Sequence, residues 1–124
     1  MTDRQYGRIL TRVALGSLLL WFGTTGIATP ETLIGYVPGW VGIDPSRAVF
    51  LNALLDTALG VLLLIGWQTR VTAAMVALHI AGIAASAGYN DVMARDTALA
   101  LVAAAVAING PDRWTLDNRK REER

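Results

Sequence analysis

The sequence contains no cysteine, which excludes a disulfide, a thiolate metal site and a CxxC redox pair. It contains a single histidine, which excludes a haem held by two histidines, and no phosphate-binding glycine loop between a strand and a helix. Any electron chemistry of this chain must therefore come from a bound cofactor or from a partner protein.

Charge is also scarce. Charged residues make up 17% of the chain, below the roughly 25% typical of soluble domains. Residues 13–30, 71–90 and 97–111 contain no Asp, Glu, Lys or Arg, and residues 48–69 contain only Asp56. A hydrocarbon core about 30 Å thick is crossed by about 20 apolar helical residues. A soluble bundle would show polar faces at a helical period, and these are missing, so we infer that lipid surrounds the chain.

The apolar runs predict an all-α, integral membrane four-helix bundle that forms one domain over residues 1–124. The fourth run is the shortest and has to include residues before Thr97 or tilt less than the others. The first run resembles a signal peptide, but its length and the three similar runs after it favour a retained helix. The expected transmembrane helices are about 9–28, 48–67, 70–89 and 93–109, with an outer loop at 29–47 and a tail at 110–124.

The connections between these helices differ in length. Residues 66–69 and 88–91 predict tight turns, which would make antiparallel hairpins of the second and third helices and of the third and fourth. The first connection is long and contains three of the four prolines together with Tyr36 and Trp40. Aromatic side chains favour the membrane–water interface, so we expect this segment to lie at the depth of the lipid headgroups.

The basic residues are distributed unevenly between the two predicted sides of the membrane. Arg47 and Arg95 fall on the side of the long loop. The positive-inside rule therefore predicts cytoplasmic N and C termini, with residues 29–47 and 88–91 outside, in a multi-pass protein of the plasma or inner membrane. The other nine basic residues are Arg4, Arg8, Arg12, Arg70, Arg113, Arg119, Lys120, Arg121 and Arg124.

Small residues recur at helical spacing and predict close helix packing. Gly16 and Gly23 lie seven positions apart on one face of the first helix. A ridge on the fourth helix has the same character and consists of Ala100, Ala103, Ala104 and Ala107.

Asp56 is the one acid inside the second apolar run. A charged side chain at the bilayer centre costs about 3 kcal/mol on insertion scales, so such residues turn inward and find partners. Asp56 lies twelve positions before Gln68, at the centre of the turn, and His79 lies eleven positions after it. At a rise of about 1.5 Å per residue the two differ in depth by about 1.5 Å. We predict that they approach within hydrogen-bond distance, directly or through one water.

Asn52 shares the helix face of Asp56, and Ser86 shares that of His79, so the predicted interior site is Asn52, Asp56, His79 and Ser86. Two interpretations remain open for it. The polar residues can serve as a clamp that fixes the register of two helices. Alternatively they form a proton-accepting or quinone-binding site, since a quinone carbonyl needs a donor and quinol oxidation needs a base.

Arg95 and Asp96 form a second pair of polar residues, at the outer end of the fourth helix. We expect Asp96 in the first turn, where the helix dipole favours a carboxylate. The expected partners of Arg95 are a ligand or the acids Asp91, Glu31 and Asp44. Helix capping and docking of the long loop are the alternative roles for this pair.

The chain resembles the DoxX family of small four-helix membrane proteins, which includes DoxD-type relatives. The resemblance runs from about residue 9 to residue 117 and depends on the order and spacing of its motifs. Relatives often carry glutamate where this chain has Asp56. The matching segments are LGSLLLWFGTTGI, the acid before GVLLLIGWQTRVTAA, and ARDTALALVAAAVAINGPDRWTLD with its Arg-Asp motif and closing aromatic-x-Leu-Asp.

The resemblance implies several functions. Some DoxD-type relatives form the membrane part of thiosulfate:quinone oxidoreductase, and others are anchors in oxidoreductase complexes. We therefore expect a redox-linked subunit with non-covalently bound quinone and an oxidoreductase partner subunit. The alternative is a non-enzymatic anchor, an assembly module, or a homo-oligomer with a cavity for lipid or a small molecule. A transporter or channel is a weaker alternative, and neither a metal site nor a nucleic-acid partner is predicted.

Overall fold

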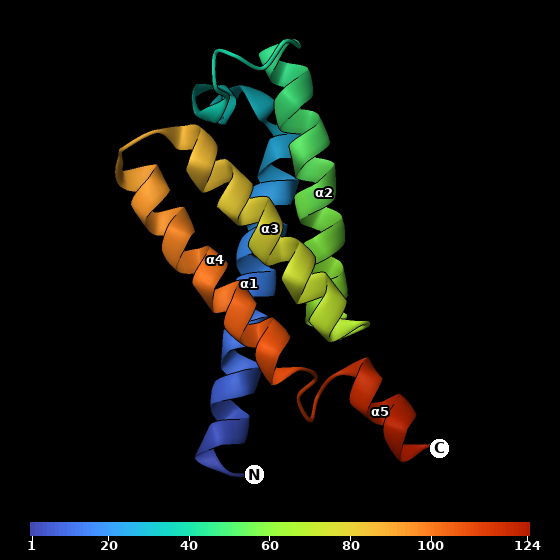
Figure 1. Cartoon of the computed structure of the whole chain (residues 1–124). Coiled ribbons are helices and arrows are strands. Elements are labelled where there is room, and N and C mark those ends of the chain that lie inside the picture. The colour runs from blue at the N-terminus through green and yellow to red at the C-terminus, as the bar shows by residue number, and fades with distance from the viewer.

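The computed structural model describes all residues from 1 to 124, and the chain consists of helices and their connections (Figure 1). The predicted all-α class with four main helices is confirmed. The long helices are α1 (Asp3–Ala28), α2 (Pro45–Ile65), α3 (Thr69–Ala87) and α4 (Asp91–Asn109). The short elements are the 3-10 turns η1 (Pro30–Thr32) and η2 (Ile34–Tyr36) and the helix α5 (Leu116–Glu122).

The helices begin earlier than the apolar runs because polar caps lie outside the runs. α1 starts six residues before the predicted position, where Thr2 and Gln5 form a reciprocal capping box. Asp44 accepts a hydrogen bond from the Arg47 amide at the start of α2. Asn90 does the same for the Met93 amide at the start of α4. Hydropathy alone locates the apolar middle of a helix, and the cap decides where the helix begins.

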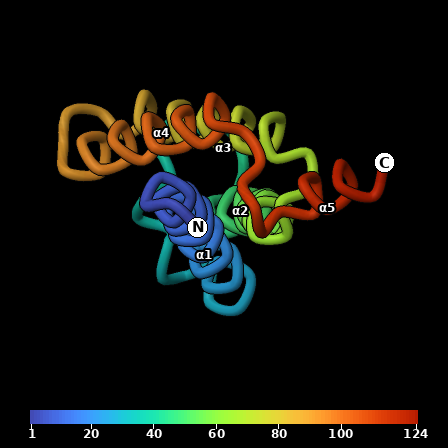
Figure 2. Tube along the Cα trace, turned by 90° about the horizontal axis from the view of Figure 1, so that it is seen from below, coloured from blue at the N-terminus to red at the C-terminus, as the bar shows by residue number.

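The four long helices form two pairs, and the pairs lie in two inclined layers. α1 packs along α2 in one layer, and α3 packs along α4 in the other (Figure 2). A Cβ on Gly60 would lie 3.0 Å from the Gly16 carbonyl oxygen, and a Cβ on Gly16 would lie 2.9 Å from Leu64 Cγ. The predicted packing face of Gly16 and Gly23 is therefore confirmed, with α2 as its partner.

The predicted hairpin of the second and third helices needs correction. A tight turn with Gly66 at φ 78° and Gln68 at φ 49° joins them, but α2 and α3 then diverge, and α3 packs on α4 (Figure 1). The reason is that the small-residue face of α2 is occupied by α1. The predicted hairpin of α3 and α4 is confirmed.

The buried core occupies one half of the molecule. Both termini lie at the end opposite the long loop (Figure 1), and we call these ends the terminal side and the loop side. The core lies where the two layers meet and consists of Leu15, Leu19, Leu59, Leu63, Ala73, Val76, Ile80, Ala103 and Val106. Seven of these residues come from the terminal-side halves of the four long helices, and Leu19 and Ile80 lie just past the middle of α1 and α3.

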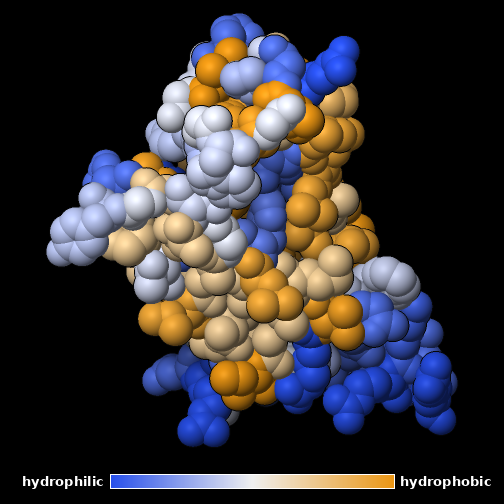
Figure 3. All heavy atoms as spheres, turned by 45° about the horizontal axis from the view of Figure 1, so that its top comes forward, coloured by the Kyte–Doolittle hydropathy of each residue, from blue (hydrophilic) through white to orange (hydrophobic).

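Hydrophobic atoms also cover much of the outer surface of the face shown in Figure 3. Large apolar side chains that are more than 60% exposed include Leu10, Leu78, Leu101 and Ile108. Such a surface is unusual for a monomer in water and suits lipid. α1, α2 and α3 are each long and apolar enough to cross a membrane. α4 is not among them and carries three charged residues within its first six. The chain is a multi-pass membrane protein.

The tail at 110–124 contains more structure than the sequence predicts. Thr115 caps α5 by accepting from the Asn118 amide. Asp117 in this helix accepts hydrogen bonds from the backbone amides of Gln68 and Thr69 at 2.8 and 2.7 Å. The Thr69 hydroxyl donates to the same carboxylate. The tail therefore caps the start of α3.

Candidate functional site

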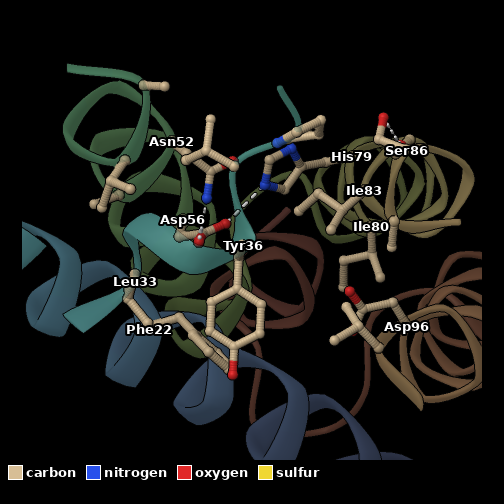
Figure 4. Close-up of a pocket in the computed structure, with 18 of the residues that line it drawn as sticks. Phe22, Leu33, Tyr36, Asn52, Asp56, His79, Ile80, Ile83, Ser86 and Asp96 are labelled. Atoms are coloured by element: carbon tan, nitrogen blue, oxygen red, sulfur yellow. Dashed lines mark hydrogen bonds and ion pairs between the residues drawn. The ribbon is translucent and has the colours of Figure 1, made fainter. Parts of the chain in front are cut away.

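Asp56, His79 and Asn52 form one polar cluster between α2 and α3, in which Asp56 is buried and the other two are half-buried (Figure 4). Asp56 Oδ1 lies 2.8 Å from His79 Nε2, and Asn52 Nδ2 donates to Asp56 Oδ2 at 3.0 Å. Asp56 is only 5% exposed. The predicted approach of Asp56 and His79 is confirmed, as is the shared helix face of Asn52 and Asp56.

This hydrogen bond forms although α2 and α3 diverge. The two residues are nearly equidistant from Gln68 along the chain, so both stand at the same height above the turn that joins their helices. An acid buried in an apolar protein interior is stabilised only by a donor, and His79 is the single titratable residue of α3 above Arg70. The side chains of Asp56 and His79 are therefore long enough to meet across the space between the backbones of α2 and α3.

The hydrogen bond to Asp56 determines which nitrogen of His79 remains as an acceptor. An ionised carboxylate only accepts hydrogen bonds, so with Asp56 ionised Nε2 carries the proton. Nδ1 of the neutral ring is then unprotonated, and it has no hydrogen-bond partner within the protein. The arrangement can accept a proton at Nδ1 while Asp56 stabilises the imidazolium that forms.

The cluster lies in the wall of a cavity of about 550 Å³ at the loop side, within the usual range for ligand pockets. Of its 25 lining residues, 17 are hydrophobic. All four long helices contribute side chains, such as Phe22 from α1, Ala53 from α2, Ile83 from α3 and Leu99 from α4. The cavity exists because α2 and α3 separate above their turn.

The long loop forms the roof of this cavity. The sequence predicts an interfacial segment held by its aromatics, and that depth stays a prediction. In the structure Tyr36 and Trp40 line the cavity and are also 53% and 72% exposed. Figure 4 shows the Tyr36 ring beside Phe22 and below Asp56. Sequence reasoning missed Tyr36 and Phe22 as lining residues. The signal that could have indicated a roof is the concentration of prolines and aromatics in a connection too apolar for a solvated linker.

Arg95 and Asp96 line another wall of the same cavity. Arg95 Nε donates to Asp96 Oδ1 at 2.9 Å, and the guanidinium lies 5.6 Å from the centre of the Phe22 ring. The expected partners Glu31, Asp44 and Asp91 make no ion pair with Arg95. The prediction for Asp96 was wrong in one respect, since α4 starts at Asp91 and Asp96 is its sixth residue. Asp96 is 5% exposed and belongs to the cavity wall.

Ser86 lines the cavity but stands apart from the polar cluster. Its hydroxyl donates to the Gly82 carbonyl of its own helix at 2.8 Å. It lies seven residues, about two helical turns, beyond His79 on α3. The structure thus brings together Asn52, Asp56 and His79 and leaves Ser86 outside their network.

The terminal side of the molecule is closed by an ion pair that sequence reasoning missed. Arg12, 2% exposed, donates Nε to Asp112 Oδ2. It also donates Nη1 to the carbonyl oxygens of Leu63 and Leu64 at 2.8 and 2.7 Å. A possible signal was the position of Arg12 directly before an uncharged run, because a buried cation needs acceptors.

The apolar core and the Arg12–Asp112 pair together separate the cavity from the terminal side. Eight of the nine core residues lie between the Asp56–His79 pair and that end of the bundle, and the ninth, Ile80, follows His79 directly on α3. The polar residues that line this cavity lie beyond most of the core, toward the loop side.

No group of three or more His, Cys, Asp or Glu side chains comes together anywhere in the chain to hold a metal ion.

Comparison with known proteins adds one finding. The family model described as DoxX matches residues 7–89, about two thirds of the chain. The matched segment contains Asn52, Asp56 and His79 and ends before Arg95. No curated protein and no solved structure matches this chain.

Proposed function

This chain belongs to the DoxX family, and we propose that it is the quinone-binding membrane subunit of an oxidoreductase complex, of the kind that thiosulfate:quinone oxidoreductase represents. Quinone would provide the two-electron acceptor, and this chain would provide the binding cavity and the proton-transfer groups.

The observation that carries the proposal is the Asp56–His79 pair in the wall of an apolar cavity. With Nε2 held by Asp56, His79 Nδ1 can accept the proton of a bound hydroxyl group. The protonated ring can in turn donate Nδ1–H to a carbonyl oxygen. Histidine is suited to general acid–base work because one ring nitrogen can hold a partner while the other gives or takes a proton.

The lining of the cavity fits a quinone headgroup. Aromatic and aliphatic side chains such as Phe22, Tyr36 and Leu99 provide surfaces for a flat apolar ring. Leu78, which also lines the cavity, is 75% exposed on the outside of α3. The cavity therefore reaches the lipid-facing surface of the bundle, where an isoprenoid tail can leave it.

The electron donor would belong to a partner protein. This chain has neither a cysteine nor a second histidine to hold a redox centre, so reducing equivalents would arrive from a neighbouring subunit. The membrane chain would then bind quinone and manage its protons.

A second candidate function is that of a non-enzymatic anchor or assembly module, and one observation favours it. The His79–Asp56 hydrogen bond is the only side-chain hydrogen bond between the bodies of α2 and α3. It can therefore act as a clamp for two helices that otherwise contact each other little. In that role the pair stabilises the bundle and needs no ligand.

Purification in mild detergent, solvent extraction and chromatography of the extract would test for bound quinone. A short-chain benzoquinone is then titrated into wild type, Asp56→Asn and the control Asp96→Asn, which neutralises another buried acid of the same cavity. We expect quinone in the wild-type extract and about tenfold weaker binding by Asp56→Asn, which corresponds to about 1.4 kcal/mol. Asp96→Asn should change the affinity less.

The absence of quinone from the extract, together with no saturable binding by wild type, would overturn the proposal. A clamp predicts a different result, because Asp56→Asn would then lower the melting temperature without altering the activity of the complex. Equal losses of binding in the two variants would indicate a general charge effect and exclude the specific role of Asp56.

A further inference from the structure

A second hollow, of about 320 Å³, lies at the terminal side between the end of α2 and the segment that leads into α5. We call it the terminal-side hollow. Five residues line it: Ile65, Arg113, Trp114, Leu116 and Arg119. It shares no residue with the loop-side cavity.

The two arginines of the hollow differ from three arginines near this end whose side chains are already bonded within the protein. Arg8 and Arg70 donate to backbone carbonyls at the end of α4, and Arg12 pairs with Asp112. Arg113 and Arg119 are exposed and have neither an ion pair nor a side-chain hydrogen bond within the protein. Guanidinium groups present a planar set of donors that matches phosphate oxygens. These two are therefore free to bind an anion.

The apolar part of the hollow indicates what carries the anion. Trp114 is 63% exposed and Ile65 is 47% exposed, and both lie beside the arginines. Tryptophan favours the boundary between lipid headgroups and hydrocarbon. A small soluble anion would leave this apolar surface uncovered, whereas an amphiphile would cover it with its chains. Figure 3 shows the hydrophilic tail next to the hydrophobic flank of the helices.

We propose that the terminal-side hollow binds an anionic glycerophospholipid, with its phosphate between Arg113 and Arg119 and its first acyl carbons against Trp114 and Ile65. Bound in this way, the lipid would bridge α2 and the segment before α5, and it would hold the tail that caps α3 through Asp117. The site is independent of the loop-side cavity and of any quinone chemistry.

The test uses the full chain in nanodiscs of phosphatidylcholine, into which phosphatidylglycerol with brominated acyl chains is titrated. Bromine quenches nearby indole fluorescence, and a Trp114→Phe variant identifies the part of the signal that Trp114 contributes. The binding variant is Arg113→Gln with Arg119→Gln. Its matched control is Arg121→Gln with Arg124→Gln, which removes the same charge from exposed positions of the same tail outside the hollow.

We expect the binding variant to need about tenfold more phosphatidylglycerol for half-maximal quenching of Trp114, the size that a lost charge-assisted hydrogen bond gives. The control should behave as wild type, and millimolar inorganic phosphate should not relieve the quenching. Both variants should melt as wild type in pure phosphatidylcholine, because none of the four arginines has a side-chain partner in the protein.

Equal weakening in the binding variant and the control would show diffuse attraction to a charged surface and overturn the proposed site. Relief of the quenching by inorganic phosphate would show an anion site that does not require lipid, which also overturns it. Quenching of Trp114 to the same extent by brominated phosphatidylcholine would mean that the arginines select no headgroup.

Discussion

Arg12 and Asp112, a hundred residues apart, form a buried ion pair at the terminal side, in which two guanidinium nitrogens face the two carboxylate oxygens. Arg12 also donates to two carbonyls near the end of α2. One side chain thereby joins α1, α2 and the segment after α4. The pair closes the terminal side of the bundle, while the loop side remains hollow.

Substituting only one member of the Arg12–Asp112 pair should lower the free energy of unfolding substantially. Asp112→Asn leaves a buried guanidinium without its counter-charge, and loss of one partner of a buried pair costs about 3 kcal/mol or more. We expect a clear fall in the free energy of unfolding, measured by thermal or denaturant unfolding in detergent micelles. Asp3→Asn, which neutralises an exposed acid of α1, is the control and should have little effect.

The double variant Arg12→Met with Asp112→Asn checks the mechanism. Because the buried charge is gone, it should cost less than the sum of the two single substitutions. Strict additivity would mean that the two groups do not interact.

Whether quinone occupies the loop-side cavity can be tested by reducing the volume of the cavity without changing its polar residues. Gly82 lines the cavity, and a Cβ placed there would meet no atom within 4 Å. Gly82→Leu should therefore fill part of the cavity and raise helix propensity at the same time. We expect an affinity for short-chain benzoquinone weaker by about tenfold or more, or about 1.4 kcal/mol, with an unchanged or higher melting temperature.

Ala74→Leu on the same helix is the control, since Ala74 is exposed and lines neither the loop-side cavity nor the terminal-side hollow. Unchanged quinone binding by Gly82→Leu would show that quinone does not bind in the loop-side cavity. A loss of binding in both leucine variants would indicate a general effect on α3.

Asp117 should give the fold a pH dependence below neutrality. Partial burial raises the pKa of Asp117, but hydrogen bonds from the backbone and hydroxyl of Thr69 and from the Gln68 amide lower it, so the pKa lies below its ordinary value. A lowered pKa in the folded state means that the carboxylate stabilises the fold above the ordinary aspartate pKa of about 3.9. This stabilisation is lost as the pH falls through the lower, folded-state value.

Melting curves between pH 3 and pH 7 in detergent would measure this contribution. Asp117→Asn should melt below wild type at pH 7, and the two curves should converge at the acid end. Parallel curves at every pH would show that the charge of Asp117 contributes nothing to the cap of α3.

The orientation in the membrane remains a prediction from the basic residues, and the absence of cysteine makes it simple to test. Gly39→Cys in the loop and Glu123→Cys in the tail each place a single thiol in the chain. We expect a membrane-impermeant maleimide to label the loop variant in intact cells. The tail variant should react only after permeabilisation, and the reverse pattern would invert the assigned topology.

Much of the candidate site could be predicted from the sequence because helical geometry is regular. Counting residues from Gln68 placed Asp56 and His79 at one depth, and the cost of burying a charge required a partner for Asp56. The same reasoning put Asn52 on the face of Asp56. Helical spacing also placed Ser86 in the predicted site with His79. In the structure the Ser86 hydroxyl instead donates a hydrogen bond to the Gly82 carbonyl of its own helix.

Other contacts could not be predicted because they depend on how separate helices meet. Arg95 pairs with its neighbour Asp96 and faces Phe22 of α1, which follows from the approach of α4 to α1. The roof position of Tyr36 depends on the path of the loop over α2 and α3.

The sequence by itself determined that the chain is helical, that it crosses a membrane, and that an acid and an imidazole share one level between two joined helices. These properties depend on local pattern and on the cost of placing charge in hydrocarbon. Only the tertiary structure decided that α2 packs on α1 rather than on α3, and hence that the core fills the terminal side and the cavity opens at the loop side. The packing of α2 on α1 depends on how the small residues of the two helices fit together, and the pattern of one helix alone does not contain that information.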